Sequence, residues 1–130
     1  MKRIIIDTNF LLIPLKFKVD IFSEFSRICN FNYKLFIFEE SINELKNIIE
    51  KQSGKDKKAA QFALKLIKLK DIEIIKSERK DVDELILDGA SKDTIIATQD
   101  MQLKKKLIKK SSSVIILRQK KYLQLLEKAL

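Results

Sequence analysis

The sequence predicts an α/β fold, a three-layer sandwich in which helices flank a central, mostly parallel sheet of about five strands. Short, continuously apolar stretches rich in β-branched residues recur along the chain, as in strands that are buried on both faces. Between them lie longer segments whose apolar residues recur at helical spacing, as in the helices that connect parallel strands. The chain has 130 residues with only 2 glycines and 1 proline, so we expect short loops and one domain over residues 1–130.

Five apolar stretches are the predicted strands, and a polar residue follows each of them directly. The first shows the pattern best, because Ile4, Ile5 and Ile6 form an unbroken β-branched run that ends at Asp7. The five stretches are residues 3–6, 35–38, 72–75, 94–97 and 114–117.

Helices are predicted between and after these strands. One begins at Ser41 and ends at Ser53-Gly54, and in the next we expect Phe62, Leu66 and Leu69 to face inward. The helix that contains Phe62 covers residues 59–69, and the remaining helices cover residues 19–28, 82–90, 101–108 and, at the end of the chain, 122–130. Glutamine, serine, glycine and lysine cluster in residues 51–58, which predicts a flexible segment.

Four carboxylates fall where this fold binds its ligands. Asp7 follows the first strand and Asp100 the fourth, which places both at the carboxyl edge of the sheet. Glu44 and Asp83 lie in the first turns of helices that follow strands, and these turns open onto the same edge. Four acids together repel one another unless a cation neutralises them, and oxygen ligands suit Mg²⁺ or Mn²⁺. The sequence therefore predicts a divalent-metal site suited to phosphodiester chemistry.

Asp7 and Asp100 also have purely structural interpretations. Asp7 with Thr8 and Asn9 would form a turn, although the apolar residues on both sides make a plain surface turn less natural. Asp100 would be the N-cap of the basic helix that follows it.

The two helical acids have similar alternatives. Ser41 and Glu44 fit a capping box, and taken alone this interpretation is the better one for Glu44. Asp83 would favour the helix dipole, while Asp81 and Glu84 form a competing capping box. The joint placement of four acids at one sheet edge favours the functional interpretation over these local ones.

Composition excludes several kinds of chemistry. The chain has no histidine, which rules out a histidine general base, a catalytic triad and histidine metal ligands. Its glycines are too few for a phosphate-binding loop. Its single cysteine, Cys29, permits no internal disulfide and fits a reducing compartment. No apolar run approaches the length of a membrane span, and Asp7 interrupts the only apolar stretch near the N-terminus, so we expect a cytoplasmic protein.

The net charge is +9, and the last thirty residues hold nine lysines and arginines against one acid, Glu127. Such segments favour a polyanion such as RNA or DNA, or else they solvate the surface. The candidate RNA-binding residues are Lys55, Lys57, Lys58, Lys104, Lys105, Lys106, Arg118 and Lys120. The phenylalanines, including Phe17, are expected in the core rather than as stacking platforms for bases.

Four stretches of this chain, IIIDTNFLL, EL, VDELI and IIATQDMQL, together resemble the PIN domain family, and the resemblance covers essentially the whole chain. It implies a small α/β domain that acts as a ribonuclease dependent on Mg²⁺ or Mn²⁺ and leaves a 5′-phosphate and a 3′-hydroxyl. Position by position, the catalytic and metal-binding acids would be Asp7, Glu44, Asp83 and Asp100, supported by Thr8, Asn9 and Thr98. Gln99 stands where the family often has asparagine, and Asp83 is preferred to Glu84 because Ile86 should face the core.

Two further stretches, SGKDKKAAQFAL and VIILRQKK, resemble the archaeal branch close to the eukaryotic endonuclease that processes precursor ribosomal RNA. This favours a role in ribosomal RNA maturation over that of a toxin in a toxin–antitoxin pair. A PIN fold that binds RNA or ribosomes without cutting, and a nuclease that acts on DNA, are the alternatives. A homodimer is possible, an antitoxin partner is possible but not favoured, and no membrane partner is expected.

Overall fold

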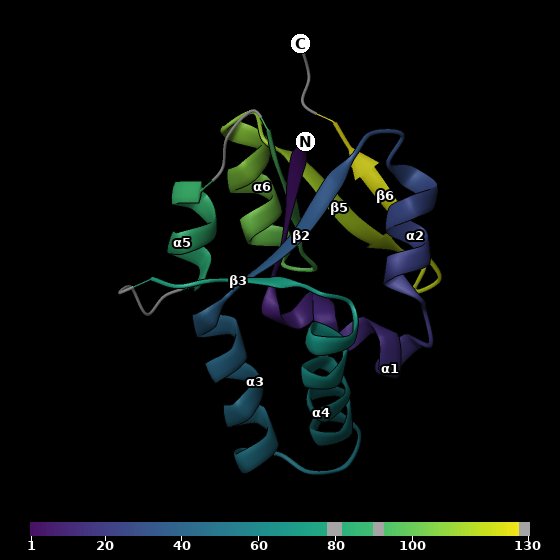
Figure 1. Cartoon of the computed structure of the whole chain (residues 1–130), viewed down its shortest axis with the longest axis vertical. Helices are drawn as coiled ribbons and strands as arrows, with labels where there is room; N and C mark the ends of the chain where they lie inside the picture. The colour runs from purple at the N-terminus through teal and green to yellow at the C-terminus, as the bar shows by residue number, and fades with distance from the viewer. Residues whose placement is uncertain (78–81, 90–92, 128–130) are drawn as a thin grey trace.

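The protein is described from a computed structural model, which covers residues 1–77, 82–89 and 93–127 (Figure 1). Its centre is a six-stranded sheet with the order β3-β2-β1-β4-β5-β6. The strands are β1 (Lys2–Ile6), β2 (Tyr33–Phe38), β3 (Glu73–Ile75), β4 (Thr94–Ala97), β5 (Ser113–Arg118) and β6 (Tyr122–Leu126). The first five are parallel and β6 is antiparallel to β5, so the predicted α/β class is confirmed with one strand more than expected.

Helices cover both faces of the sheet. They are the 3₁₀ helix η1 (Thr8–Leu12) and the α-helices α1 (Ile13–Phe17), α2 (Ile21–Ile28), α3 (Glu39–Lys51), α4 (Gly54–Leu69), α5 (Val82–Gly89) and α6 (Met101–Lys109). In Figure 1, α5 and α6 lie on one side of the sheet and α2 on the other, while α3 and α4 extend from the lower end of the strands.

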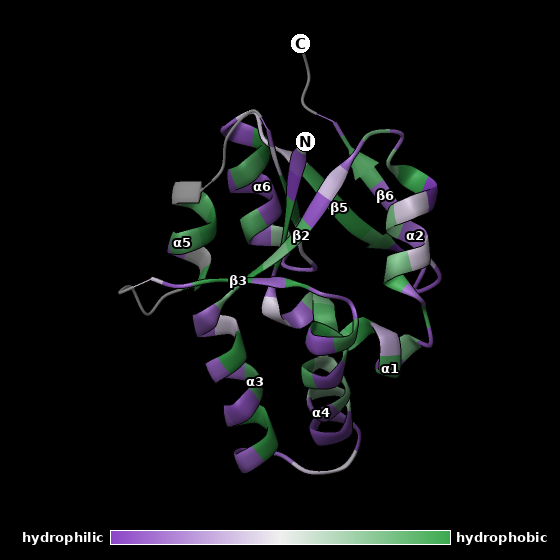
Figure 2. Cartoon of the chain, viewed as in Figure 1, coloured by the Kyte–Doolittle hydropathy of each residue, from purple (hydrophilic) through white to green (hydrophobic). Residues whose placement is uncertain are grey.

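Side-chain alternation along the strands builds two separate cores. Ile4 and Ile6 pack in the core on the α2 side, whereas Ile5 packs with α5 and α6 on the other side. A strand covered on both faces needs apolar residues at every position, which is why β1 reads as an unbroken isoleucine run. Figure 2 shows the complementary pattern in α3 and α4, whose hydrophobic residues gather on one side of each helix.

The predicted helix over residues 122–130 is wrong within the described residues, because Tyr122–Leu126 forms strand β6. Leu123 is buried between the exposed Tyr122 and Gln124, which is the two-residue period of a strand. The sequence of the connecting turn does not indicate a hairpin, because Gln119 and Lys120 have positive φ angles of 52° and 55° although neither is glycine or asparagine.

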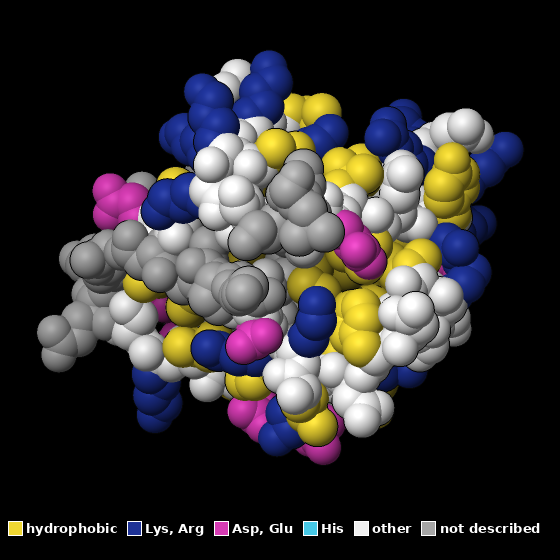
Figure 3. All heavy atoms as spheres, turned by 90° about the horizontal axis from the view of Figure 1, so that it is seen from above, with side chains coloured by type: hydrophobic (Ala, Val, Ile, Leu, Met, Phe, Trp, Pro, Cys, Tyr) yellow, Lys and Arg dark blue, Asp and Glu magenta, His cyan; other side chains and the backbone are white. Residues whose placement is uncertain are grey.

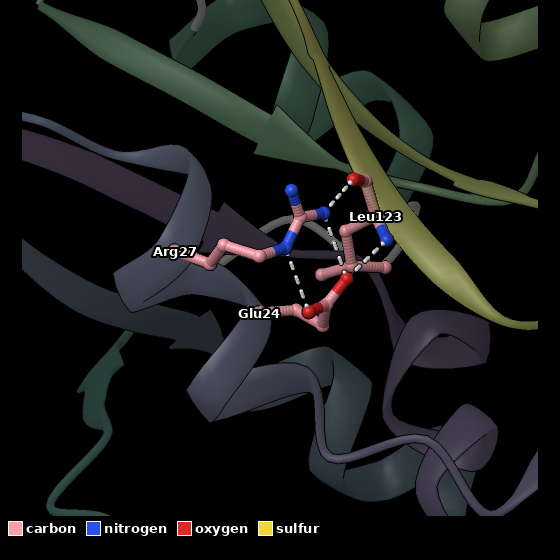
Figure 4. Close-up of polar contacts among 3 residues, drawn as sticks. All are labelled: Glu24, Arg27 and Leu123. Carbon is pink, nitrogen blue, oxygen red and sulfur yellow. Dashed lines mark hydrogen bonds and ion pairs between the residues drawn. The ribbon is translucent and has the colours of Figure 1, made fainter.

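Two side chains of α2 form hydrogen bonds to the backbone of this edge strand (Figure 4). Arg27 donates to the carbonyl oxygen of Leu123, and Glu24 accepts from the Leu123 backbone N–H, each at 2.9 Å. Arg27 also donates twice to Glu24, at 2.9 Å in each case. The outward backbone groups of Leu123 are therefore satisfied, which removes a pairing site from the open edge of the sheet.

Helices α3 and α4 begin earlier than predicted. Helix α3 starts at Glu39 with Phe38 as its N-cap residue, so Ser41 lies inside the helix and its buried hydroxyl has no hydrogen-bond partner among the described residues. The capping box of Ser41 and Glu44 is therefore wrong. Helix α4 starts at Gly54, so most of the segment expected to be flexible is helical.

The inner face of α4 also differs from the prediction. Leu66 is buried as expected, but Phe62 is 37% exposed and Leu69 is 75% exposed. Alanines instead form much of the buried face, and their small side chains allow α4 to pack closely on its neighbours. The buried residues of this helix are Ala59, Ala60, Ala63, Leu66 and Ile67. Within the described chain, no helix has both the length and the apolar character needed to cross a bilayer.

Candidate active site

The site lies where the chain reverses its direction across the sheet. From β1 the chain moves to β2 and β3 on one side, then returns to β4 on the other side of β1. Ligands of doubly wound sheets bind outside the carboxyl ends of the strands at such a switch point. Asp7 follows β1 and Asp100 lies three residues after β4, so both predicted acids fall at this point.

Asp7 is held from several directions and is only 6% exposed. Its backbone N–H donates to the carbonyl oxygen of Ala97 at 2.9 Å, which extends the pairing of β1 with β4. Its Oδ1 accepts from the Thr8 N–H, and its Oδ2 accepts from the Thr98 hydroxyl, both at 2.8 Å. Asp7 thus caps η1, as the turn interpretation expects, while its carboxylate faces a pocket.

Thr98 links the two acids. It is fully buried, and its hydroxyl donates to Asp7 while accepting from the Asp100 backbone N–H at 3.0 Å. Asp100 Oδ1 accepts from the N–H groups of Gln102 and Leu103 at 2.9 and 3.2 Å, which makes Asp100 the N-cap of α6. Because this cap uses only one carboxylate oxygen, capping and a role in the pocket are compatible.

Glu44 reaches the same place from α3. Its Oε1 accepts a hydrogen bond from the Thr8 hydroxyl, so a residue adjacent to Asp7 orients it. Asn9 is exposed, and its carbonyl oxygen accepts from Gln99 Nε2 at 2.8 Å. That bond joins the segment after β1 to the segment after β4.

These residues line a pocket of about 390 Å³, here called the acidic pocket. Its lining residues are Asp7, Thr8, Asn9, Glu44, Asn47, Ile48 and Asp100. Sequence reasoning missed Asn47 and Ile48, although both lie three or four residues after Glu44 and hence on the same side of the helix. Three of the four predicted acids are thus brought together from three distant segments.

The fourth acid, Asp83, lies in the first turn of α5 after β3, but its side chain is outside the described part of the structure. The neighbouring Glu84 is exposed, and Ile86 is buried as expected. The preference for Asp83 over Glu84 therefore stays a prediction.

The donor chemistry of the acidic pocket fits a hard divalent ion. Carboxylate and amide oxygens line it, and these are the ligands that Mg²⁺ and Mn²⁺ prefer. Among the described side chains, no three acidic or cysteine residues approach closely enough to form a preorganised metal cluster. Mg²⁺ usually keeps several waters and takes only one or two protein carboxylates.

The predicted RNA-binding residues divide into two groups. Lys104, Arg118 and Lys120 line a second hollow beside Thr98 and Gln99, next to the acidic pocket. The remaining lysines are exposed on α4 and α6, outside these hollows, and are Lys55, Lys57, Lys58, Lys105 and Lys106. Figure 3 views the molecule from above Figure 1, at the end of the sheet away from α3 and α4, and shows further lysine and arginine side chains around the rim of that upper face.

Two curated relatives are ribonucleases by name. The chain is 32% identical over 127 residues to ribonuclease VapC4 of Methanocaldococcus jannaschii, covering 96% of this chain and 97% of the relative. It is 31% identical over 103 residues to ribonuclease VapC9 of Archaeoglobus fulgidus, covering 78% and 73% of the two chains.

Solved structures share the fold at low sequence identity. The PIN domain endonuclease Utp24 matches with a TM-score of 0.79 and 20% identity, covering 98% of this chain and 95% of that one. A domain of a functionally unknown protein from Methanocaldococcus jannaschii matches with a TM-score of 0.62 and 13% identity, covering 91% and 92% of the two chains.

The family described as PIN like domain matches residues 4–120. That range contains all four predicted acids, the whole of β4 and all of β1 except its first two residues. The chain therefore belongs to the PIN-like domain family, as the resemblance of its motifs predicted.

Proposed function

We propose that this protein is a divalent-metal-dependent endoribonuclease that hydrolyses RNA phosphodiester bonds. The observation that carries the proposal is the meeting of Asp7, Glu44 and Asp100 in one pocket at the switch point of a PIN-like sheet. The names of the VapC relatives support this reaction class.

The acids would hold the ion, with Asp7 and Asp100 nearest the strand ends and with Glu44 and Asp83 completing the set. When bound, Mg²⁺ or Mn²⁺ supplies charge neutralisation and Lewis-acid polarisation at the phosphate. Thr98 fixes Asp7 and Asp100 relative to each other, and Thr8 orients Glu44. These hydrogen bonds would hold the carboxylate groups at the strand ends before substrate arrives.

The reaction is a hydrolysis in which the oxygen of a water molecule forms a bond to phosphorus. The bond between phosphorus and the 3′ oxygen breaks, which gives a 5′-phosphate and a 3′-hydroxyl. The proton of the attacking water passes to a pocket carboxylate, and the departing 3′ oxygen takes a proton from solvent. Lysine and arginine side chains beside the pocket would hold the flanking phosphates, so binding should weaken as salt rises.

The first cellular role we propose is RNA processing, in particular maturation of ribosomal RNA in the cytoplasm. Motif similarity to the processing branch supports it, and the structural likeness to Utp24 is compatible with it. The alternative role is that of a toxin-type ribonuclease with an antitoxin partner, and the similarity to ribonuclease VapC4 supports the ribonuclease activity that both roles share. A toxin-type enzyme should arrest growth when expressed alone in a host cell, whereas a processing enzyme should leave growth nearly unchanged.

The first experiment is cleavage of labelled RNA by purified protein with Mn²⁺, Mg²⁺ or EDTA, beside an Asp7→Asn variant. Asparagine keeps the size of the side chain and removes its charge, so we expect cleavage to fall by at least about 100-fold while circular dichroism stays unchanged. The variant also controls for contaminating nucleases, because both proteins are prepared identically.

Each alternative function predicts a different result. Tight RNA binding without cleavage in any metal would replace the enzyme by a binding module. Faster cleavage of single-stranded DNA than of RNA of the same sequence would assign the site to a DNA nuclease. Equal activity of wild type and Asp7→Asn would exclude the acidic pocket as the site of hydrolysis.

A further inference from the structure

The acidic pocket continues into a longer furrow. A neighbouring hollow shares Asn9 and Asp100 with the acidic pocket. The same hollow shares Phe17 and Gln99 with the hollow at the β5–β6 turn. The three hollows together, here called the furrow, lead from the acids at the ends of β1 and β4 to the turn after β5.

The far end of the furrow combines apolar and cationic side chains. Phe17, Met101 and Leu117 supply apolar surface, and Met101 is 56% exposed. The lining cations are Lys104, Arg118 and Lys120, and none of them forms an ion pair with a carboxylate among the described residues. An apolar platform edged by cations without acidic partners has the character of a site for an anionic, partly flat ligand.

Phe17 and Lys120 are close to each other. The Lys120 ammonium nitrogen lies 5.6 Å from the centroid of the Phe17 ring, and the ring is only partly buried. A nucleotide has the same two parts, a base that stacks on rings and a phosphate that binds ammonium groups. Phe17 packs against the edge of the core, in line with the expectation, and its partly exposed ring also lines the furrow.

The turn that presents Lys120 is built from unfavourable residues. The Lys121 N–H donates to the Arg118 carbonyl oxygen at 2.9 Å, and Gln119 and Lys120 both have positive φ angles within the three residues that connect Arg118 to its strand partner Tyr122. Such turns favour asparagine and glycine, but this chain has Gln119 and Lys120, and both line the furrow.

We propose that the far end of the furrow binds one unstacked nucleotide of single-stranded RNA, next along the strand from the phosphodiester at the acidic pocket. Its base stacks on Phe17 and Met101, and its phosphate contacts Lys120 and Arg118. A polymer is the occupant because the furrow joins this subsite to the acids, and single-stranded because only an unstacked base can lie on a ring. The inference rests on the proposed function, since the same RNA occupies both ends.

The first test measures binding of a fluorescently labelled single-stranded RNA of about eight nucleotides by anisotropy in EDTA, so that no cleavage occurs. Phe17→Leu keeps apolar bulk and removes the ring, and we expect its affinity to fall about tenfold, the loss typical of one stacking partner. Phe22→Leu is the matched control: Phe22 is also half-buried, its ring lies 5.2 Å from the Lys70 ammonium nitrogen, and it is outside the furrow. We expect this control to bind like wild type.

An oligomer of abasic sites with the same number of phosphates tests for stacking directly. We expect Phe17→Leu and wild type to bind it equally, because it has no base. If Phe17→Leu loses as much affinity for this oligomer as for RNA, the ring supports only the surface and the nucleotide subsite is wrong.

The second test uses the turn. Lys120→Gly removes the cation and supplies the residue that the turn prefers, so we expect thermal stability to be kept or raised while RNA affinity falls. The slope of log affinity against log salt should also decrease by about one. Lys68→Ala, which removes an exposed lysine of α4 away from the furrow, should change neither quantity appreciably.

The two proposals fail in different ways. If Phe17→Leu and Lys120→Gly both bind and cleave RNA like wild type, the nucleotide subsite is overturned, while loss of cleavage in Asp7→Asn would still support the enzyme. If wild type never cleaves but both furrow variants lose RNA affinity, the enzyme is overturned and the nucleotide subsite stands. If wild type does not bind the RNA in EDTA, the subsite is overturned.

Discussion

The acidic pocket and the β5–β6 hairpin lie at the same side of the sheet but are held in different ways. The pocket depends on parallel pairing and on one buried hydroxyl, that of Thr98, which joins two acids that are close in space. The hairpin depends on hydrogen bonds from the side chains of Glu24 and Arg27 to the backbone of Leu123 on an edge strand (Figure 4). These two side chains lie almost one hundred residues earlier in the chain. The pocket is thus a product of sheet topology, whereas the hairpin is a product of long-range side-chain contacts.

This difference predicts how each region responds to substitution. Asp7, Thr8 and Thr98 at the base of the pocket are buried, where a lost hydrogen bond leaves a donor or an acceptor without a partner. The groups of the hairpin are partly exposed, so water replaces a lost contact and the loss is smaller. Damage to the pocket should lower both stability and activity, while damage to the hairpin should mainly lower stability and RNA binding.

Thr98→Val should have the largest effect on stability among the variants discussed. Valine keeps the shape of the buried side chain but removes the hydroxyl that serves both Asp7 and Asp100. We expect the free energy of unfolding to fall by about 2 kcal/mol, because two buried polar groups lose their partner. Cleavage should fall as well, since the two acids are no longer fixed relative to each other. Urea unfolding and an RNA cleavage assay measure the two effects.

Thr98→Ser is the matched control, because serine keeps the hydroxyl and loses only a methyl group. It should retain most of the stability and of the activity. A Thr98→Val protein as stable and as active as wild type would show that the linkage through Thr98 is not what holds the pocket.

Glu24→Gln tests the hairpin through pH. The hydrogen bonds from Arg27 hold the pKa of Glu24 below its ordinary value, against the opposing effect of partial burial. The folded state therefore binds a proton at Glu24 less readily than the unfolded state does. The contacts of ionised Glu24 with Arg27 and Leu123 accordingly stabilise the fold above the unfolded-state pKa. That contribution is lost as the pH falls through the folded-state pKa. We expect the free energy of unfolding of wild type to exceed that of Glu24→Gln by about 1 kcal/mol at neutral pH, and this difference to shrink as the pH falls below the ordinary pKa of glutamate.

The exposed pair of Lys34 and Glu73 gives the comparison, with its two charged atoms 3.2 Å apart and both side chains more than half exposed. Glu73→Gln should change the free energy of unfolding by no more than a few tenths of a kcal/mol at neutral pH. If Glu24→Gln costs no more than Glu73→Gln, the contacts with Leu123 do not stabilise the edge strand.

Sequence reasoning succeeded where local pattern and topology were sufficient. Short stretches rich in apolar and β-branched residues identified the five parallel strands, and parallel strands share one carboxyl edge, which brought Asp7 and Asp100 together. Helical spacing placed Glu44 on α3 even though the start of the helix was misplaced by two residues, because the side of the helix that a residue occupies depends on spacing and not on the cap.

Sequence reasoning failed where a distant contact decides the structure. The leucines of the segment that begins at Tyr122 fit a short helix as well as a strand. Pairing with β5 and the hydrogen bonds from Glu24 and Arg27 to Leu123 select the strand. Phe17 is apolar and follows an apolar run, so its partial exposure depends on where α1 ends against the β5–β6 turn. Neither outcome is encoded in the neighbouring residues.

Gln119→Asn should have the smallest effect and the opposite sign. Asparagine tolerates positive φ better than glutamine does, so relieving the turn should raise the free energy of unfolding by about 0.5 kcal/mol. The change leaves Lys120 in place, and RNA binding should therefore be retained, in contrast to Lys120→Gly. Gln61→Asn on the exposed side of α4 is the control and should be slightly destabilising, because asparagine is a weaker helix former. A stabilised turn with intact binding would show that RNA binding needs the side chain of Lys120 and not the conformational cost at Gln119.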